Sequence, residues 1–138
     1  MGWRVIAAIF ALITTPTTLA AQNADPWTGL YQAIDHVDGS IDHLSIFANG
    51  DGSYTLVGTA SNHGACTEKA GMPKRGWHKA SGTLRDGKLT RENVIVTCEG
   101  LEDTIRVADS VLTRDATSGT LSVPVKNGTK TLVFHRID

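Results

Sequence analysis

The chain has 138 residues, 41% of them hydrophobic and 20% charged, and its 13 lysines and arginines nearly balance 14 aspartates and glutamates. This length suits one domain with a single core, and the formal net charge of −1 argues against nucleic acid as a partner of the whole domain. After Ile13, no apolar run approaches the roughly 20 residues that a membrane-spanning helix needs.

The N-terminal segment has the pattern of a secretory signal peptide. Arg4 supplies a positive charge, Val5–Ile13 is an unbroken apolar run, and small residues stand at the expected cleavage site. We therefore expect residues 1–21 to be removed, which leaves residues 22–138, roughly 117 residues, as one domain with a formal net charge of −2. The mature protein is expected to be secreted or periplasmic, without stable insertion into a membrane.

Short stretches in which apolar and polar residues alternate follow the signal peptide, with turn-forming dipeptides between many of them. In Asp42–Phe47, for example, Leu44 and Ile46 alternate with polar neighbours, which is typical of an antiparallel strand. We predict no amphipathic helix. We predict eight strands, at Trp27–Asp35, Ile41–Ala48, Ser53–Thr59, His78–Leu84, Lys88–Cys98, Thr104–Thr113, Thr120–Val125 and Thr129–Ile137. A meander of this length closes to remove its edges, so the expected fold is all-β, a small barrel or a barrel-like sandwich.

The first predicted hairpin carries several acidic residues. If Asp38-Gly39 forms a two-residue turn, Asp35 lies opposite Asp42 and two like charges face each other. A divalent ion held by these aspartates would relieve the repulsion. The alternative is an exposed acidic hairpin tip in solvent.

Cys66 and Cys98 are the two cysteines of the chain. In an exported protein such a pair predicts a disulfide, which would stabilise the fold by about 3–4 kcal/mol through the loop it closes. The alternative is a zinc site in which His63 and His78 complete a tetrahedral set with the two sulfurs.

The longest connection without a strand pattern is Ser61–Trp77, and loops of this length are frequently functional. Basic and aromatic residues gather at its end, where they would suit a small anionic or aromatic molecule. The predicted ligand residues are Lys74, Arg75, Trp77 and His78. The alternative is a solvated loop whose tryptophan packs against the barrel mouth.

The sequence contains none of the common hydrolase motifs, such as G-x-S-x-G, S-x-x-K or H-E-x-x-H. We therefore predict no catalytic residue and no cofactor, and we interpret the protein as a binding or envelope-accessory module. The alternative function is an unrecognised hydrolase or a metal-dependent activity that uses His63 and His78, or the hairpin with Asp35 and Asp42.

The segment Trp27-x-Gly29-x-Tyr31, the Leu44 and Ile46 strand, the turn Gly50–Tyr54 and the two cysteines form a weakly specific pattern. This pattern resembles small secreted bacterial proteins and, more distantly, calycin-type meander barrels such as lipocalins and avidins. In lipocalins a glycine precedes the first-strand tryptophan, whereas here Gly29 follows Trp27. The resemblance therefore implies an architecture and no binding residue.

Overall fold

The computed structural model describes residues 25–36, 38–125 and 128–138. The predicted signal peptide lies outside these residues. Within them the chain forms nine strands and one helix: β1 (Gly29–Ile34), β2 (Ile41–Ala48), β3 (Ser53–Ala60), α1 (Gly64–Ala70), β4 (Gly76–Arg85), β5 (Lys88–Cys98), β6 (Thr104–Arg106), β7 (Ser110–Arg114), β8 (Leu121–Val125) and β9 (Lys130–Arg136).

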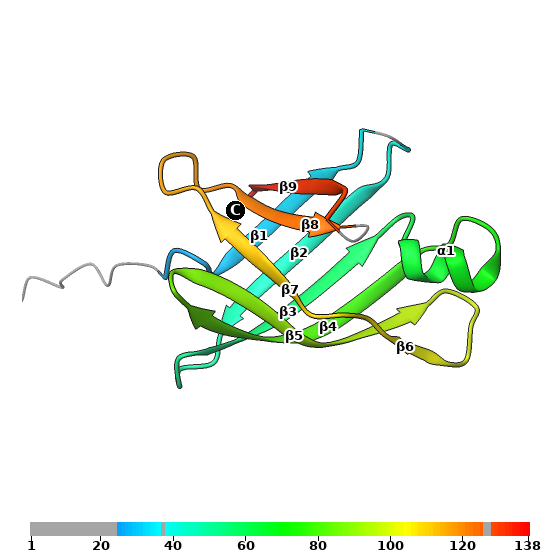
Figure 1. Ribbon diagram of the computed structural model, residues 1–138, viewed down its shortest axis with the longest axis horizontal. Helices are drawn as coiled ribbons and strands as arrows, with labels where there is room; N and C mark the ends of the chain where they lie inside the picture. The colour runs from blue at the N-terminus through cyan, green and yellow to red at the C-terminus, as the bar shows by residue number, and fades with distance from the viewer. Residues whose placement is uncertain (1–24, 37, 126–127) are drawn as a thin grey trace, which may run out of the picture.

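The strands form one closed antiparallel barrel (Figure 1). Their order around the ring is β4-β3-β2-β1-β9-β8-β7-β5, and the pairing of β4 with β5 completes it. β6 also pairs with β5, on a different part of that long strand from β7. Apart from β6 and β7, which both pair with β5, strands that are consecutive in sequence lie side by side, as a meander predicts. Of the two architectures expected from the sequence, the barrel is the one that forms.

The stretch predicted as one strand at Thr104–Thr113 is divided into β6 and β7. Both parts pair with β5, through Arg106 with Ile95 and Leu112 with Leu89. The break lies near Asn93, which has a φ of 54°, where the pairing of β4 with β5 shifts register. This is a β-bulge, and its extra residue interrupts the pairing on both sides of β5.

The connection between β1 and β2 differs from the predicted two-residue turn. Ile34 pairs with Ile41 and Ala33 with Asp42, and the backbone N–H of Asp35 donates to the Ser40 carbonyl at 2.8 Å. The predicted pairing of Asp35 with Asp42 is therefore wrong by two positions. A shift of two positions leaves each side chain on the same face of the strand, so both aspartates still point to the inside of the barrel.

Large side chains fill the barrel end at which β1 begins. Trp27 is only 5% exposed, and Leu56, Leu112 and Leu121 are completely or almost completely buried. The Asp25 carboxylate accepts a hydrogen bond from the Tyr54 hydroxyl at 2.7 Å and one from the Trp27 backbone N–H at 2.8 Å. The segment before β1 thus closes this end, which we call the packed end.

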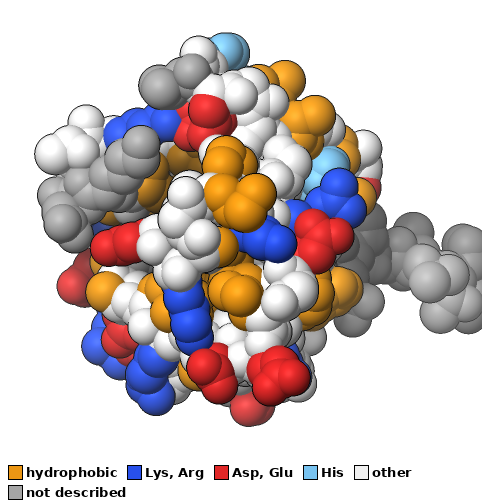
Figure 2. Space-filling model, turned by 90° about the vertical axis from the view of Figure 1, so that its right-hand side faces the viewer, with side chains coloured by type: hydrophobic (Ala, Val, Ile, Leu, Met, Phe, Trp, Pro, Cys, Tyr) orange, Lys and Arg blue, Asp and Glu red, His pale blue; other side chains and the backbone are white. Residues whose placement is uncertain are grey.

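The opposite end carries α1 and the loop between β1 and β2, on the right-hand side of Figure 1. Figure 2 views the molecule from that side and shows acidic and basic side chains interspersed with hydrophobic ones. We call this the mouth of the barrel. Its mixed charges agree with the nearly neutral composition of the chain.

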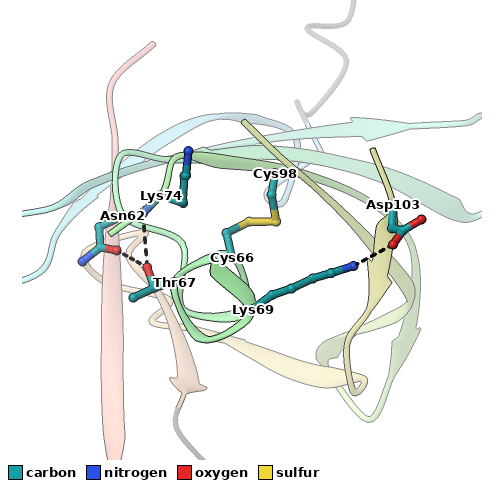
Figure 3. The surroundings of a disulfide bond; sticks show 7 residues. All are labelled: Asn62, Cys66, Thr67, Lys69, Lys74, Cys98 and Asp103. Atoms are coloured by element: carbon teal, nitrogen blue, oxygen red, sulfur yellow. Dashed lines mark hydrogen bonds and ion pairs between the residues drawn. A yellow bond between two sulfur atoms is a disulfide. The ribbon is translucent and has the colours of Figure 1, made fainter. Parts of the chain in front are cut away.

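Helix α1 lies beside the mouth, where no helix was predicted. Its seven residues are too few for an apolar period to show, and a disulfide from Cys66 to Cys98 of β5 holds it in place (Figure 3). Gly71, with a φ of 71°, ends the helix by donating its N–H to the Thr67 carbonyl. The predicted disulfide is confirmed. No helix in the described part of the chain is both long and apolar enough to cross a membrane.

Candidate functional site

Small inward-facing residues on β3 and β4 leave space inside the mouth. Gly58, Ala60, Gly76 and Ala80 are all buried, so they occupy core positions without filling them. A Cβ added to Gly58 would lie 2.4 Å from Cε1 of His78, and one added to Gly76 would lie 2.7 Å from Sγ of Cys66. Glycine is therefore required where the histidine and the disulfide enter the barrel. The resulting cavity has a volume of about 880 Å³.

One wall of the cavity is apolar and the other carries polar and ionisable groups. The apolar wall comes from β5, the segment before β7, β8 and β9: Val94, Val107, Val123, Leu132 and Phe134. The polar groups come from β2, β4, β5, β7 and β9, from the residue after β1 and from the residue before α1. They are Asp35, Asp42, His63, His78, Arg91, Ser110 and Lys130. A cavity of this size with one apolar wall and a few polar groups is the usual form of a site for a small organic molecule.

Arg91 on β5 is the most unusual of these polar residues. Its side chain is largely buried, and its Nε donates a hydrogen bond of 2.9 Å to Oγ of Ser110 on β7. Its Nη1 lies 3.4 Å from Nε2 of His78 on β4. Among the described residues, no carboxylate forms an ion pair with Arg91. Burial alone lowers the pKa of the guanidinium, and its positive charge remains uncompensated.

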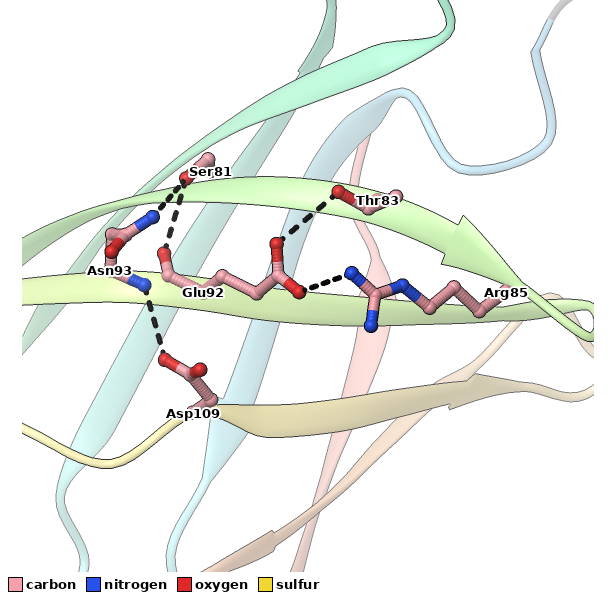
Figure 4. A network of polar contacts seen from close by, with 6 residues as sticks. All are labelled: Ser81, Thr83, Arg85, Glu92, Asn93 and Asp109. Carbon is pink, nitrogen blue, oxygen red and sulfur yellow. Dashed lines mark hydrogen bonds and ion pairs between the residues drawn. The ribbon is translucent and has the colours of Figure 1, made fainter.

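Arg91 points inward because it lies two residues after the core residue Leu89, and the bulge that follows returns Val94 to the same face of β5. Figure 4 shows the polar contacts that Glu92 and Asn93, at the bulge, make with neighbouring strands. Glu92 accepts hydrogen bonds from Arg85 at 2.9 Å and from Thr83 at 3.4 Å, and the backbone N–H of Asn93 donates to Asp109 at 3.1 Å. Glu92 and Asn93 are thus held against β4 and the start of β7. Arg91, the residue before them, takes the inward position of the alternating strand.

His63 and His78 lie near Arg91, with their ring centroids 6.0 Å apart. Burial lowers the pKa of His78 to about 3, with a further contribution from the charge of Arg91, and burial also lowers the pKa of His63. Both rings are therefore neutral near pH 7. Because a guanidinium can only donate, Nε2 of His78 accepts from Arg91 and the ring proton sits on Nδ1. That Nδ1 is buried and has no hydrogen-bond partner among the described residues.

Three further ionisable groups stand at the opposite side of the mouth. The Lys130 ammonium contacts the Asp35 carboxylate, which joins β9 to the end of β1. Asp42 on β2 is half-buried, and burial raises its pKa to about 6, with further contributions from the charges of Asp35 and Asp38 that Lys130 partly opposes. Asp35 and Asp42 therefore both line the cavity without being the predicted cross-strand pair, and a lysine accompanies them.

The four predicted ligand residues do not lie together. Trp77 is 45% exposed and points away from the barrel, whereas His78, the next residue of β4, points into the cavity. Arg75 is exposed, and neither it nor Lys74 lines the cavity. Consecutive residues of a strand face opposite sides, which separates this group. His78 is the member that the cavity shares with the prediction.

Sequence reasoning missed Arg91, although a signal for it exists. Leu89 and Arg91 occupy alternating positions of a predicted strand, so a charge falls on the face of a core leucine. A charge on a core face is rare without a functional reason or a partner. The bulge after Arg91 obscured this pattern, because it changes the phase of the alternation before Val94.

The two alternative metal sites take a different form in the structure. The disulfide uses both sulfurs of the zinc set that included His63 and His78. In the described ranges, no group of three or more histidine, cysteine, aspartate or glutamate side chains is placed to hold a metal ion. Within the same ranges, the hydrogen bond from Arg91 is the one side-chain hydrogen bond of the His63 and His78 rings.

Comparison of the chain with protein families, with curated proteins and with solved structures finds no match.

Proposed function

We propose that the protein is a binding module without catalysis, which takes a small and largely apolar molecule into the mouth of its barrel. The observation that carries this proposal is the cavity of about 880 Å³, with its wall of valine, leucine and phenylalanine side chains. The packed end closes the barrel below it, so a ligand has an apolar surface to bury and one open side.

The same proposal includes an exported protein, secreted or periplasmic. The Cys66–Cys98 disulfide supports this location, since such bonds persist in oxidising compartments. The apolar N-terminal pattern of the sequence supports it as well.

A neutral fluorescent probe, N-phenyl-1-naphthylamine, tests the cavity directly. We expect its emission to rise on binding to the wild-type protein. Ala65→Trp places a large side chain at the half-buried position of α1 that lines the cavity, and we expect it to abolish binding. Ala116→Trp, at an exposed position in the turn between β7 and β8, is the matched control and should bind normally. Equal binding by both folded variants would contradict the proposal.

A further inference from the structure

We propose that the ligand is a carboxylic acid bound as its monoanion, with its carboxylate on Arg91 and its apolar body against the valine wall of the cavity. This inference rests on the proposed binding function and names the chemical class of the ligand. Four observations carry it: the unused donors of Arg91, the charge of the surroundings, the position of the apolar wall and the fixed orientation of the guanidinium.

Arg91 retains hydrogen-bond donors after its contacts within the protein are counted. A guanidinium has five N–H groups, of which one bonds Ser110 and one bonds His78. The others have no acceptor among the described residues. Nδ1 of His78 is a further buried donor without a partner there. A carboxylate has two oxygens that accept several hydrogen bonds, and it is the usual planar partner of a guanidinium.

The surrounding charges select an anion with a single charge. His63 and His78 are neutral, because burial lowers the pKa of each ring. Lys130 and Asp35 compensate each other by direct contact, and Asp42 adds negative charge when it is ionised. Arg91 is thus the one uncompensated cation among the described residues that line the cavity. A monoanion neutralises it, whereas a dianion would bring surplus negative charge into a poorly solvated space.

Carboxylates at the edge of the cavity add to this preference for a singly charged ligand. Asp38, Glu68 and Asp109 are exposed carboxylates at the edge of the cavity. They would repel a phosphate or a dicarboxylate at the open side. A cationic ligand is disfavoured for a different reason, because it would share the buried space with the Arg91 charge.

The apolar wall begins beside the guanidinium. Val94 follows Arg91 on the same inward face of β5, after the bulge, and Val123 and Phe134 continue the wall on β8 and β9. A carboxylate on Arg91 therefore leaves the rest of the ligand next to hydrophobic side chains. The orientation of Arg91 is fixed in advance by the Ser110 hydrogen bond and by the contacts of its neighbour Glu92 (Figure 4). Such preorganisation lowers the entropic cost of binding.

A matched set of competitors tests the ligand class. Displacement of N-phenyl-1-naphthylamine at pH 7.5 is measured with 4-phenylbutyrate, with the neutral 4-phenylbutan-1-ol, and with the dianion benzylmalonate. We expect the wild-type protein to prefer the monocarboxylate over the alcohol by at least about tenfold, as a charge-assisted hydrogen bond provides. We also expect it to bind the monocarboxylate more tightly than the dianion.

The variant Arg91→Gln should bring the ratio of acid to alcohol affinity close to one while retaining the neutral probe. Arg91→Lys keeps the charge without the planar fork and should keep only part of the preference. The control is Arg75→Gln, which removes an exposed charge outside the cavity and should leave the ratio unchanged. If Arg91→Gln does not fold, the ratio is measured in two single variants, Arg91→Lys and Ser110→Ala, and each should lower it below the wild-type value.

The two proposals fail in distinguishable ways. Failure of the wild-type protein to bind the neutral probe would contradict the binding function itself. Normal binding of the probe with equal displacement by acid and alcohol would overturn only the carboxylate inference. An acid-to-alcohol ratio as large in the folded Arg91 variants as in the wild-type protein, or a preference for benzylmalonate, would overturn it as well.

Discussion

At the scale of residues, two ionisable side chains of the cavity respond to pH in opposite directions. The pKa of Asp42 is raised to about 6 by burial, so the folded protein holds a proton that the unfolded chain releases between about pH 4 and 6. Stability from this group therefore falls as the pH rises through that range. Burial lowers the pKa of His78 to about 3, so its contribution rises with pH from about 3 to 6.5.

Replacement of one of these groups isolates its contribution. We expect Asp42→Asn to raise the free energy of unfolding at pH 7.5 by about 1–2 kcal/mol, because it removes a half-buried charge near Asp35 and Asp38. The gain should disappear by about pH 4, where the Asp42 carboxyl of the folded wild-type protein is protonated and as uncharged as the asparagine of the variant. Urea denaturation across this pH range measures the difference. Asp103→Asn, at an exposed ion pair with Lys69, is the control and should have little effect. A loss of stability in Asp42→Asn at pH 7.5 would contradict the assignment.

Arg91 illustrates a conflict between stability and binding at a single residue. A largely buried guanidinium without a carboxylate partner in the described structure destabilises the fold. Ser110 and His78 offset part of this cost through hydrogen bonds. A residue of this kind is expected at sites where function limits stability.

At the scale of elements, α1 depends on contacts with the barrel more than on its own sequence. Seven residues are too short for a stable isolated helix, and His63 at its N-terminus makes no side-chain cap. The helix is held by the disulfide, by the Thr67 hydroxyl, which donates to Asn62 at 2.6 Å, and by the ion pair of Lys69 with Asp103 (Figure 3). Because Ala65 and Thr67 line the cavity, the position of this helix shapes the mouth.

Removal of the disulfide should therefore affect both stability and binding. For Cys66→Ala together with Cys98→Ala we expect a loss of about 3–4 kcal/mol in the free energy of unfolding, since the bond closes a long loop of the unfolded chain. The remaining folded protein should bind N-phenyl-1-naphthylamine more weakly, because α1 is then held by surface contacts alone. Denaturation and probe titration measure the two effects. Lys69→Ala, which removes only the exposed ion pair, is the control and should retain both properties.

At the scale of the whole molecule, the barrel divides into a packed end and a cavity at the mouth. The ring closes where β1 pairs with β9, at Tyr31 with Arg136 and at Gln32 with His135, and the closed sheet surrounds both regions. The packed end holds most of the buried aromatic and leucine side chains. The mouth holds the small residues, the ionisable groups and the apolar wall with Leu132 and Phe134. Stability is thus expected to depend mainly on one end and ligand binding on the other.

Two leucines on neighbouring strands test this division. Leu121 on β8 is completely buried, whereas Leu132 on β9 is half-buried and lines the cavity. Leu121→Ala should lower the free energy of unfolding by about 2–5 kcal/mol, as is usual for a buried leucine, and leave probe affinity unchanged. Leu132→Ala should cost about 1 kcal/mol, because its side chain already borders open space, and it should weaken probe binding. Equal effects of the two changes on both properties would contradict the division.

The sequence alone determined the features of this protein that depend on local pattern. Alternation with period two, as at Leu44 and Ile46, marks strands because successive side chains of a strand face opposite sides. Turn residues between the strands indicate a meander, and the pair Cys66 and Cys98 indicates a disulfide. The all-β meander and the covalent link followed from these patterns, whereas the choice between barrel and sandwich did not.

Only the tertiary structure decided where the cavity residues meet. The alternation of residues predicts which face of its strand His78 points to. It does not predict which side chains lie opposite His78 inside the barrel. Arg91, His78 and Ser110 come together because β4, β5 and β7 are neighbours and because a bulge sets the phase of β5. The pairing of β5 with β7, the closure of the ring and the position of the bulge depend on contacts between distant segments, and no local pattern contains them.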